Sequence, residues 1–219
     1  IASELEALRI AIMEGVVATA LPEIEHRLAQ VHIWWQQNRA SQTVAEAPDT
    51  EVLARTLISG LDVAQQADVA REDWDSALQR LDLALTVQRE MQRPAQEIGA
   101  TRFNRANVLN QLGHHAEAKA ELEDCLVLFE HKPDWRAKVL SSLADVLDKQ
   151  GDIPQAILQE RRALALRESL PDPQDRAISH GNLADYLERS ETPVDQAASH
   201  SHQLAALLYF LVTGLGQHL

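Results

Sequence analysis

The chain has 219 residues, 45% of them hydrophobic, which is enough apolar material for a folded core. Twenty basic and thirty-three acidic side chains give a formal net charge of −13. A field of this sign repels nucleic-acid phosphates and anionic membrane surfaces, so the composition predicts neither a nucleic-acid partner nor a membrane partner.

The single cysteine and the two ends of the chain bear on where the protein is found and on whether the chain is complete. Cys125 can form no internal disulfide and fits a reducing compartment, so we expect a cytoplasmic protein. The apolar run from Leu204 to Val212 is about half the length that spans a bilayer. Because the chain begins at Ile1 and not at methionine, we expect a fragment or a processed product.

Helix signals occur along the whole chain. Glycine and proline fall mostly where a helix would stop, and no alternating β-branched run extends past four positions, so the sequence predicts an all-α fold. Cap residues followed by proline mark helix starts at Asp172-Pro173 and Thr192-Pro193, and Ser3 begins a capping box. In chain order we expect helices near 3–20, 22–39, 50–70, 73–92, 96–112, 114–130, 134–149, 152–169, 173–189 and 192–213, that is, five helix pairs.

A small residue recurs in the second helix of successive pairs, with partners four and seven positions on. The copies are Ala77/Leu81/Ala84, Ala118/Leu122/Cys125, Ala156/Glu160/Ala163 and Ala197/Ser201/Leu204, spaced by 41, 38 and 41 residues. A period of this length in a helical chain predicts stacked helical hairpins, a solenoid. Helices should nearly touch at Ala118 and Ala156.

Two glycines fit the same period. Gly113 and Gly151 each lie five residues before the recurrent alanine, where one helix must stop and turn into the next. Glycine tolerates the left-handed backbone conformation found at such ends.

The polar segment from Ser41 to Asp49 marks a boundary between the first helix pair and the rest. We therefore expect an N-terminal helical pair at 1–47 that packs on repeats over 48–219, and these repeats would continue beyond the chain.

The segments "NRANVLNQLGHHAEAKAEL" and "LSSLADVLDKQGDIPQAILQERRALALRESLPDPQDRAISHGNLADYL" resemble tetratricopeptide repeats. The long period is similar to the extended kinesin-light-chain-like subtype that is widespread in bacterial proteins. The likeness covers roughly Val52 to the C-terminus and implies a right-handed solenoid of helical hairpins. Arg105, Glu160 and Glu191 depart from the residues usual in the family, and the first helix of the hairpin at 50–92 could be irregular.

The resemblance also implies a groove lined by the first helix of each pair. Helical spacing identifies the residues opposite the apolar stripe, and these are polar. The predicted peptide-binding groove comprises Phe103, Asn104, Asn107, Gln111, Lys138, Ser141, Ser142, Asp145, Asp148, Asn182, Asp185 and Arg189, with Gly181 beside them. Asparagine offers a donor and an acceptor to the main chain of an extended peptide. The alternative is that these residues are ordinary solvated helix faces.

Charge and residue type narrow the expected partner. Asp145, Asp148, Asp185 and Glu188 favour a cationic or neutral protein or peptide by electrostatic complementarity. Neither His114-His115 nor His200 and His202 show a recognised ligand spacing, so no metal and no cofactor are predicted. Cys125 takes a small core site of the repeat, and no catalytic motif is found, so we do not expect an enzyme.

Two apolar features remain. Ile24, Leu28, Val31 and Trp35 form one helical stripe, so Trp35 should be core, whereas Trp34 falls off it and should pack on the next hairpin or else be an exposed anchor. The helix around Leu204 to Val212 is apolar on nearly every side, which predicts continuation into another repeat or self-association through this segment.

The leading hypothesis is a peptide- or protein-binding scaffold, the docking or sensing part of a larger protein. The alternative is the regulatory repeat region of an enzyme, a signalling ATPase or a peptidase, whose catalytic domain lies outside this chain. A structural oligomerisation module is the third possibility. The repeat is a scaffold that serves many partners, and the sequence does not identify one.

Overall fold

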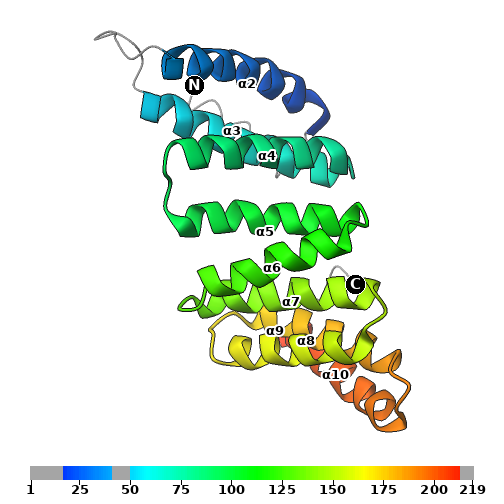
Figure 1. Cartoon of the computed structure of the whole chain (residues 1–219). Helices are drawn as coiled ribbons and strands as arrows, with labels where there is room; N and C mark the ends of the chain where they lie inside the picture. The colour runs from blue at the N-terminus through cyan, green and yellow to red at the C-terminus, as the bar shows by residue number, and fades with distance from the viewer. Residues whose placement is uncertain (1–16, 41–49, 213–219) are drawn as a thin grey trace. The chain divides into compact units, whose positions relative to one another are not determined.

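The computed structural model describes residues 17–40 and 50–212, and within these ranges every regular element is an α-helix. The helices are α2 (Val17–Ala40), α3 (Thr50–Ala70), α4 (Trp74–Glu90), α5 (Ala95–Gln111), α6 (His115–Leu128), α7 (Pro133–Lys149), α8 (Ile153–Glu168), α9 (Pro173–Glu188) and α10 (Pro193–Val212) (Figure 1). The all-α repeat fold is therefore confirmed. Most of the helix expected at 3–20 and the segment 41–49 lie outside the described residues.

The helices form two compact units, which divide between Leu112 and Gly113. In the first, α2 packs on α3, α3 on α4, and α4 on α5. In the second, α6 through α10 pack in the same consecutive manner. Within each unit, the helices therefore pack on their neighbours in the chain, as stacked hairpins require.

The apolar faces of the helices make the cores. In the first unit, Trp35, Leu57 and Val87 bring α2, α3 and α4 into one cluster. Leu28, Val31 and Trp35 are buried as their stripe predicts. In the second unit, Leu140, Leu183 and Leu187 are fully buried, and Phe129 stacks on Trp135 with ring centroids 4.8 Å apart.

The recurrent small residues are buried in three of their four copies. The copies headed by Ala77, Ala118 and Ala156 are buried at all three positions. The fourth assignment is wrong, because Ala197 and Ser201 are exposed and Leu204 is 63% exposed. There α10 turns Ser199 and Ala206 inward instead, and the Ser199 hydroxyl donates to the Ala184 carbonyl over 2.9 Å.

The turns between helices repeat one hydrogen-bond pattern. Gly113 and Gly151 have φ of 81° and 82°, which confirms the predicted left-handed turns. Glu72 and Gln92 take the same conformation, with φ of 59° and 49°. Around Glu72, Gln92 and Gly151, the next amide donates back across the turn: Asp73 to Asp68, Arg93 to Gln88, and Asp152 to Leu147, each over 2.9 Å.

The last turn works differently. The caps predicted at Asp172 and Thr192 are present, since Asp172 accepts from the Gln174 amide and Thr192 from the Asp195 amide. Ser190 and Thr192 also donate to the Asp195 carboxylate, over 2.8 and 2.6 Å. This side-chain network closes the turn where Glu191 stands in place of glycine.

Both ends of the described chain differ from the expected pattern. The helix break expected between residues 20 and 22 is wrong, because α2 begins at Val17 and continues through Pro22. Pro22 lies in the second turn of this helix, where it donates no hydrogen bond to the Ala18 carbonyl and its ring crowds that carbonyl. On α10, Leu204, Leu207, Leu208 and Leu211 are exposed, as the sequence predicts for an uncovered face. No helix in the described ranges is long and apolar enough to cross a membrane.

Replacing Ala156 by leucine should overpack the contact of α8 with its neighbours, because Ala156 is fully buried. We expect the free energy of unfolding to fall by about 1–3 kcal/mol. Ala165 lies on the same helix but is exposed, so Ala165→Leu is the matched control and should stay within about 0.5 kcal/mol of the parent. Urea denaturation measures both, and equal stability of the two variants would contradict the packing assignment.

Candidate functional site

A groove runs between α3 and α5 in the first unit and contains two adjoining cavities. The first has a volume of about 310 Å³ and the second about 320 Å³. Asn104 on α5 lines both, so the cavities follow one another along the helix. Both α3 and α5 are first helices of their pairs, and the second helix α4 also lines the cavities.

The first cavity, which we call the amide cavity, is lined mainly by carboxamides over an apolar floor. Its apolar residues are Val69, Trp74 and Val108. Its carboxamides are Gln65, Gln66, Asn104, Asn107 and Gln111. No charged side chain is among the residues that line it. Such a surface can donate and accept hydrogen bonds without selecting a charge.

Two of these carboxamides are not used by the fold. Asn104 and Asn107 are half-buried, and neither side chain has a hydrogen-bond partner among the described residues. In contrast, Gln66 donates to Asp62 over 2.9 Å. Half-buried amides that lack partners within the protein are available to an external main chain.

In the second unit, polar residues of the corresponding helix face are hydrogen-bonded within the protein. On α9, Asn182 donates to the Ser141 hydroxyl of α7 over 3.3 Å, and Ser141 donates to the Glu160 carboxylate of α8 over 2.8 Å. The helices α7 and α9 thus bring two predicted groove residues together. Asn182 is oriented by this chain of bonds, whereas Asn104 is not.

Glu160 is the centre of a buried polar network. The Ser179 hydroxyl donates to its carboxylate over 2.7 Å, and the Arg167 guanidinium lies 3.5 Å away. All three residues are buried. Desolvation raises the pKa of Glu160 above its ordinary value, although the bonds from Ser179 and Ser141 and the charge of Arg167 oppose this shift.

The predicted acidic character of the groove is weaker than the sequence implies. Arg189 pairs with Asp148 over 2.8 Å and lies over the Tyr186 ring, while Lys149 pairs with Asp145 over 3.2 Å. Basic side chains therefore compensate two of the four carboxylates that favoured a cationic partner. These pairings depend on which side chains the fold brings beside each carboxylate.

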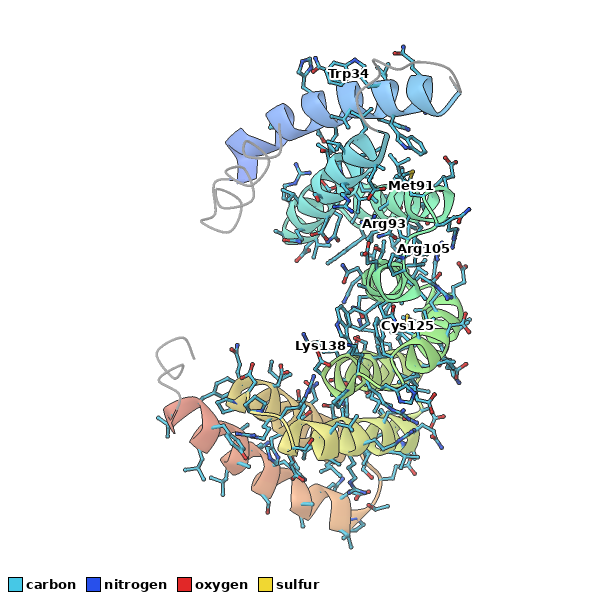
Figure 2. All side chains as sticks on the ribbon, turned by 90° about the vertical axis from the view of Figure 1, so that its left-hand side faces the viewer. Trp34, Met91, Arg93, Arg105, Cys125 and Lys138 are labelled. Carbon is cyan, nitrogen blue, oxygen red and sulfur yellow. The ribbon has the colours of Figure 1, made fainter. Side chains whose placement is uncertain are left out.

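The other residues of the predicted groove lie on α5, α7 and α9, but they line neither of the two cavities. Phe103 and Ser142 are half-buried, and Asp185 and Glu188 are exposed. Lys138 is exposed, with its ammonium 5.5 Å from the Trp135 ring centroid (Figure 2).

Sequence reasoning missed the contribution of α3. A helix was expected at 50–70 with the possibility that it is irregular; α3 is continuous and supplies Gln65 and Gln66 to the amide cavity. The signal was available, because Gln65 lies about one repeat length before Asn104. Gln88 and Thr101, which line the second cavity, were also missed, since neither falls on the predicted polar face.

Aromatic and sulfur side chains do not extend this site. Trp34 is 43% exposed on α2, which disfavours the preferred interpretation that it packs on the next hairpin (Figure 2). Cys125 is fully buried, as its place in the repeat predicts. Within the described ranges, no three histidine, cysteine or acidic side chains cluster in a way that could hold a metal ion.

A histidine pair joins α9 to α10. The Nδ1 atoms of His180 and His202 lie 2.8 Å apart, and His180 stacks on Tyr209. One neutral ring can donate to the other at this distance. Partial burial lowers the pKa of both histidines below their ordinary value of 6.5, and the mutual repulsion of the charged rings adds to the effect at His202.

Comparison with known proteins agrees with the geometry. Residues 97–169 match the tetratricopeptide repeat family. The chain is similar in structure to BtubC (BKLC) from P. vanneervenii, with a TM-score of 0.63 and 16% identity, over 85% of this chain and 73% of that one. It is also similar to the nearly identical TPR-like repeats of a putative kinesin light chain from Podosopora anserina, with a TM-score of 0.66 and 16% identity, over 96% and 95%.

A further similar structure is the apo form of RapI, with a TM-score of 0.58 and 15% identity, over 97% of this chain and 66% of RapI. Comparison with curated protein sequences gives no match. The resemblance to tetratricopeptide repeats of the kinesin-light-chain-like type is thereby confirmed, and at these identities the similar structures establish the fold alone.

Replacing Glu160 by leucine should remove the only carboxylate that pairs with buried Arg167 in the described part of the chain. An uncompensated buried charge destabilises by about 3–5 kcal/mol, so the single variant should unfold at much lower urea concentration. The double variant Glu160→Leu/Arg167→Leu removes both charges and should recover most of the stability. A single variant as stable as the parent would contradict the assignment of this ion pair.

Acidification should weaken the contact between α9 and α10. Because folding lowers the pKa of His180 and His202, the unfolded chain binds protons more readily, and stability is lost as the pH falls below about 6.5. We expect thermal unfolding of the parent to shift to lower temperature between pH 7.5 and pH 5.5. His202→Asn, which removes one ring of the pair, should show a smaller shift, and His200→Asn, at an exposed position, serves as the control.

Proposed function

We propose that this chain, in which residues 97–169 are tetratricopeptide repeats, is a protein-interaction scaffold that holds an extended segment of a partner in the groove between α3 and α5. The observation that carries the proposal is the pair of half-buried carboxamides on Asn104 and Asn107, which have no partner within the described residues. The fold does not require these groups, so binding is their best explanation.

The spacing of the carboxamides suits an extended chain. Asn104, Asn107 and Gln111 lie on one face of α5 and span about 10 Å, at 1.5 Å of rise per residue. An extended segment covers this distance in about three residues, at roughly 3.3 Å each. The carboxamides can bond its main chain, while Val69 and Trp74 offer apolar contact to a side chain.

The second unit supplies a further surface in this proposal. Lys138, Asp185 and Arg189 are exposed along α7 and α9, beside Ser141 and Asn182. We propose that these residues also contact a protein partner. The partner's charge is not fixed by this face, since Asp148 is paired with Arg189.

The proposed role is binding and involves neither catalysis nor a cofactor. It is compatible with a docking or sensing region of a larger protein and with the regulatory repeats of an enzyme. Self-association through residues 204–212 remains a separate proposal, supported by the exposed leucines of α10.

Selection from a phage-displayed library of random octapeptides tests the groove. Enriched peptides, labelled with a fluorophore, should bind the parent chain in an anisotropy titration. We expect Asn104→Ala/Asn107→Ala to weaken binding about tenfold or more, since two hydrogen bonds of ordinary strength are lost. The melting temperature should be nearly unchanged, because neither side chain is bonded within the described structure.

Gln96→Ala is the matched control, because Gln96 is an exposed carboxamide on α5 that lies outside both cavities. This variant should bind like the parent. A library that enriches no peptide, or peptides that bind the double variant as tightly as the parent, would show that this groove is not a peptide-binding site.

A further inference from the structure

The second cavity of the groove, which we call the Gln88 cavity, differs from the amide cavity in its chemistry. Its volume is about 320 Å³, and it is formed by α3, α4 and α5. Ile58, Leu61 and Leu81 give it apolar walls. Its polar lining includes the carboxylates of Asp62 and Glu97, the guanidinium of Arg80 and the carboxamide of Gln88.

Gln88, one of the residues that line this cavity, has an unmet acceptor. The residue is 3% exposed, and its Nε2 donates to the Thr101 hydroxyl over 2.9 Å. Its Oε1 is buried and has no hydrogen-bond partner among the described residues. A buried acceptor without a donor is unfavourable, so a donor that enters the cavity would stabilise the complex.

The charges around the cavity leave Asp62 without a cation. Arg80 lines the cavity, but its guanidinium is held by Asp68 and by Glu25, the latter over 2.8 Å. The Glu97 carboxylate pairs with Arg93 over 3.0 Å. Among the described residues, Asp62, which is exposed, accepts hydrogen bonds from the side-chain amides of Gln65 and Gln66 alone.

We infer that the Gln88 cavity binds the side chain of a lysine in the partner segment. The inference rests on the proposed function, since the lysine would belong to the segment held by Asn104 and Asn107. Its alkyl stem would lie along Ile58 and Leu61, and its ammonium would donate to Asp62 and, after a rotation of the Gln88 side chain that exposes it, to Gln88 Oε1. An ammonium has three donors that can reach separate acceptors, whereas a guanidinium is best matched by a bidentate partner.

The test uses a probe of the side chain alone. The full chain, labelled with 15N, is titrated with Nα-acetyl-lysine methylamide and with Nα-acetyl-norleucine methylamide, which has the same stem without the charge. The lysine probe should shift the NMR signals of the Gln88 side-chain amide and of the Thr101 backbone amide. The norleucine probe should shift them little at the same concentration.

Variants identify the acceptors. Asp62→Asn should weaken binding of the lysine probe about tenfold or more, because a hydrogen bond to a charged group is lost. Gln88→Leu should weaken it as well, and its melting temperature verifies that it folds. Asp75→Asn, at an exposed carboxylate on α4 outside the cavity, is the control and should bind like the parent.

Each outcome has a distinct meaning. Equal shifts by both probes, no shift by either, or unchanged binding in Asp62→Asn would overturn the inference and leave the cavity as a site for water only. Library peptides that require Asn104 and Asn107 but show no preference for lysine would overturn the inference alone. Binding of the lysine probe together with indifference of peptides to Asn104 and Asn107 would overturn the proposed function instead.

Discussion

Close approach of helices at buried alanines is the constraint on which the other features of this protein depend. Ala77 and Ala156 have no exposed surface, and each sits on the second helix of a hairpin that cannot cover its own apolar face. A larger side chain there would separate the helices. Because the second helices are packed in this way, the polar faces of the first helices remain available, and the groove between α3 and α5 follows from that arrangement.

The two units use the same polar residue types for different purposes. On α9, Asn182 is tied through Ser141 to the buried Glu160, so its polarity supports the fold. On α5, Asn104 has no such tie. The difference lies in the second helix behind each face: α8 places a carboxylate at the core position of the repeat, while α4 places Leu81 there. A single difference at this core position, glutamate in one repeat and leucine in the other, thus distinguishes an asparagine that is bonded within the fold from one that is available to a partner.

Most of the helices could be predicted from the sequence because their signals are local. Proline and cap residues fix the starts of α9 and α10, and the glycines at 113 and 151 fix two turns. The inward face of α10 could not be predicted, since its turn is closed by Ser190, Thr192 and Asp195 and not by a left-handed residue. The partners of Asp148 and Glu160 also escaped prediction, because they depend on which helices meet.

The left-handed residues at the ends of α4 have a consequence for motion. Glycine takes this conformation without strain, whereas another residue pays roughly 1–2 kcal/mol for it. Glu72 and Gln92 bound α4 on both sides, so this helix is held between two strained turns, while Gly113 and Gly151 relieve the turns beside α6 and α8. Local opening of α4 therefore releases strain at both ends. Amide hydrogen exchange should be faster at the ends of α4 than at those of α8, and such opening would admit solvent beside Gln88.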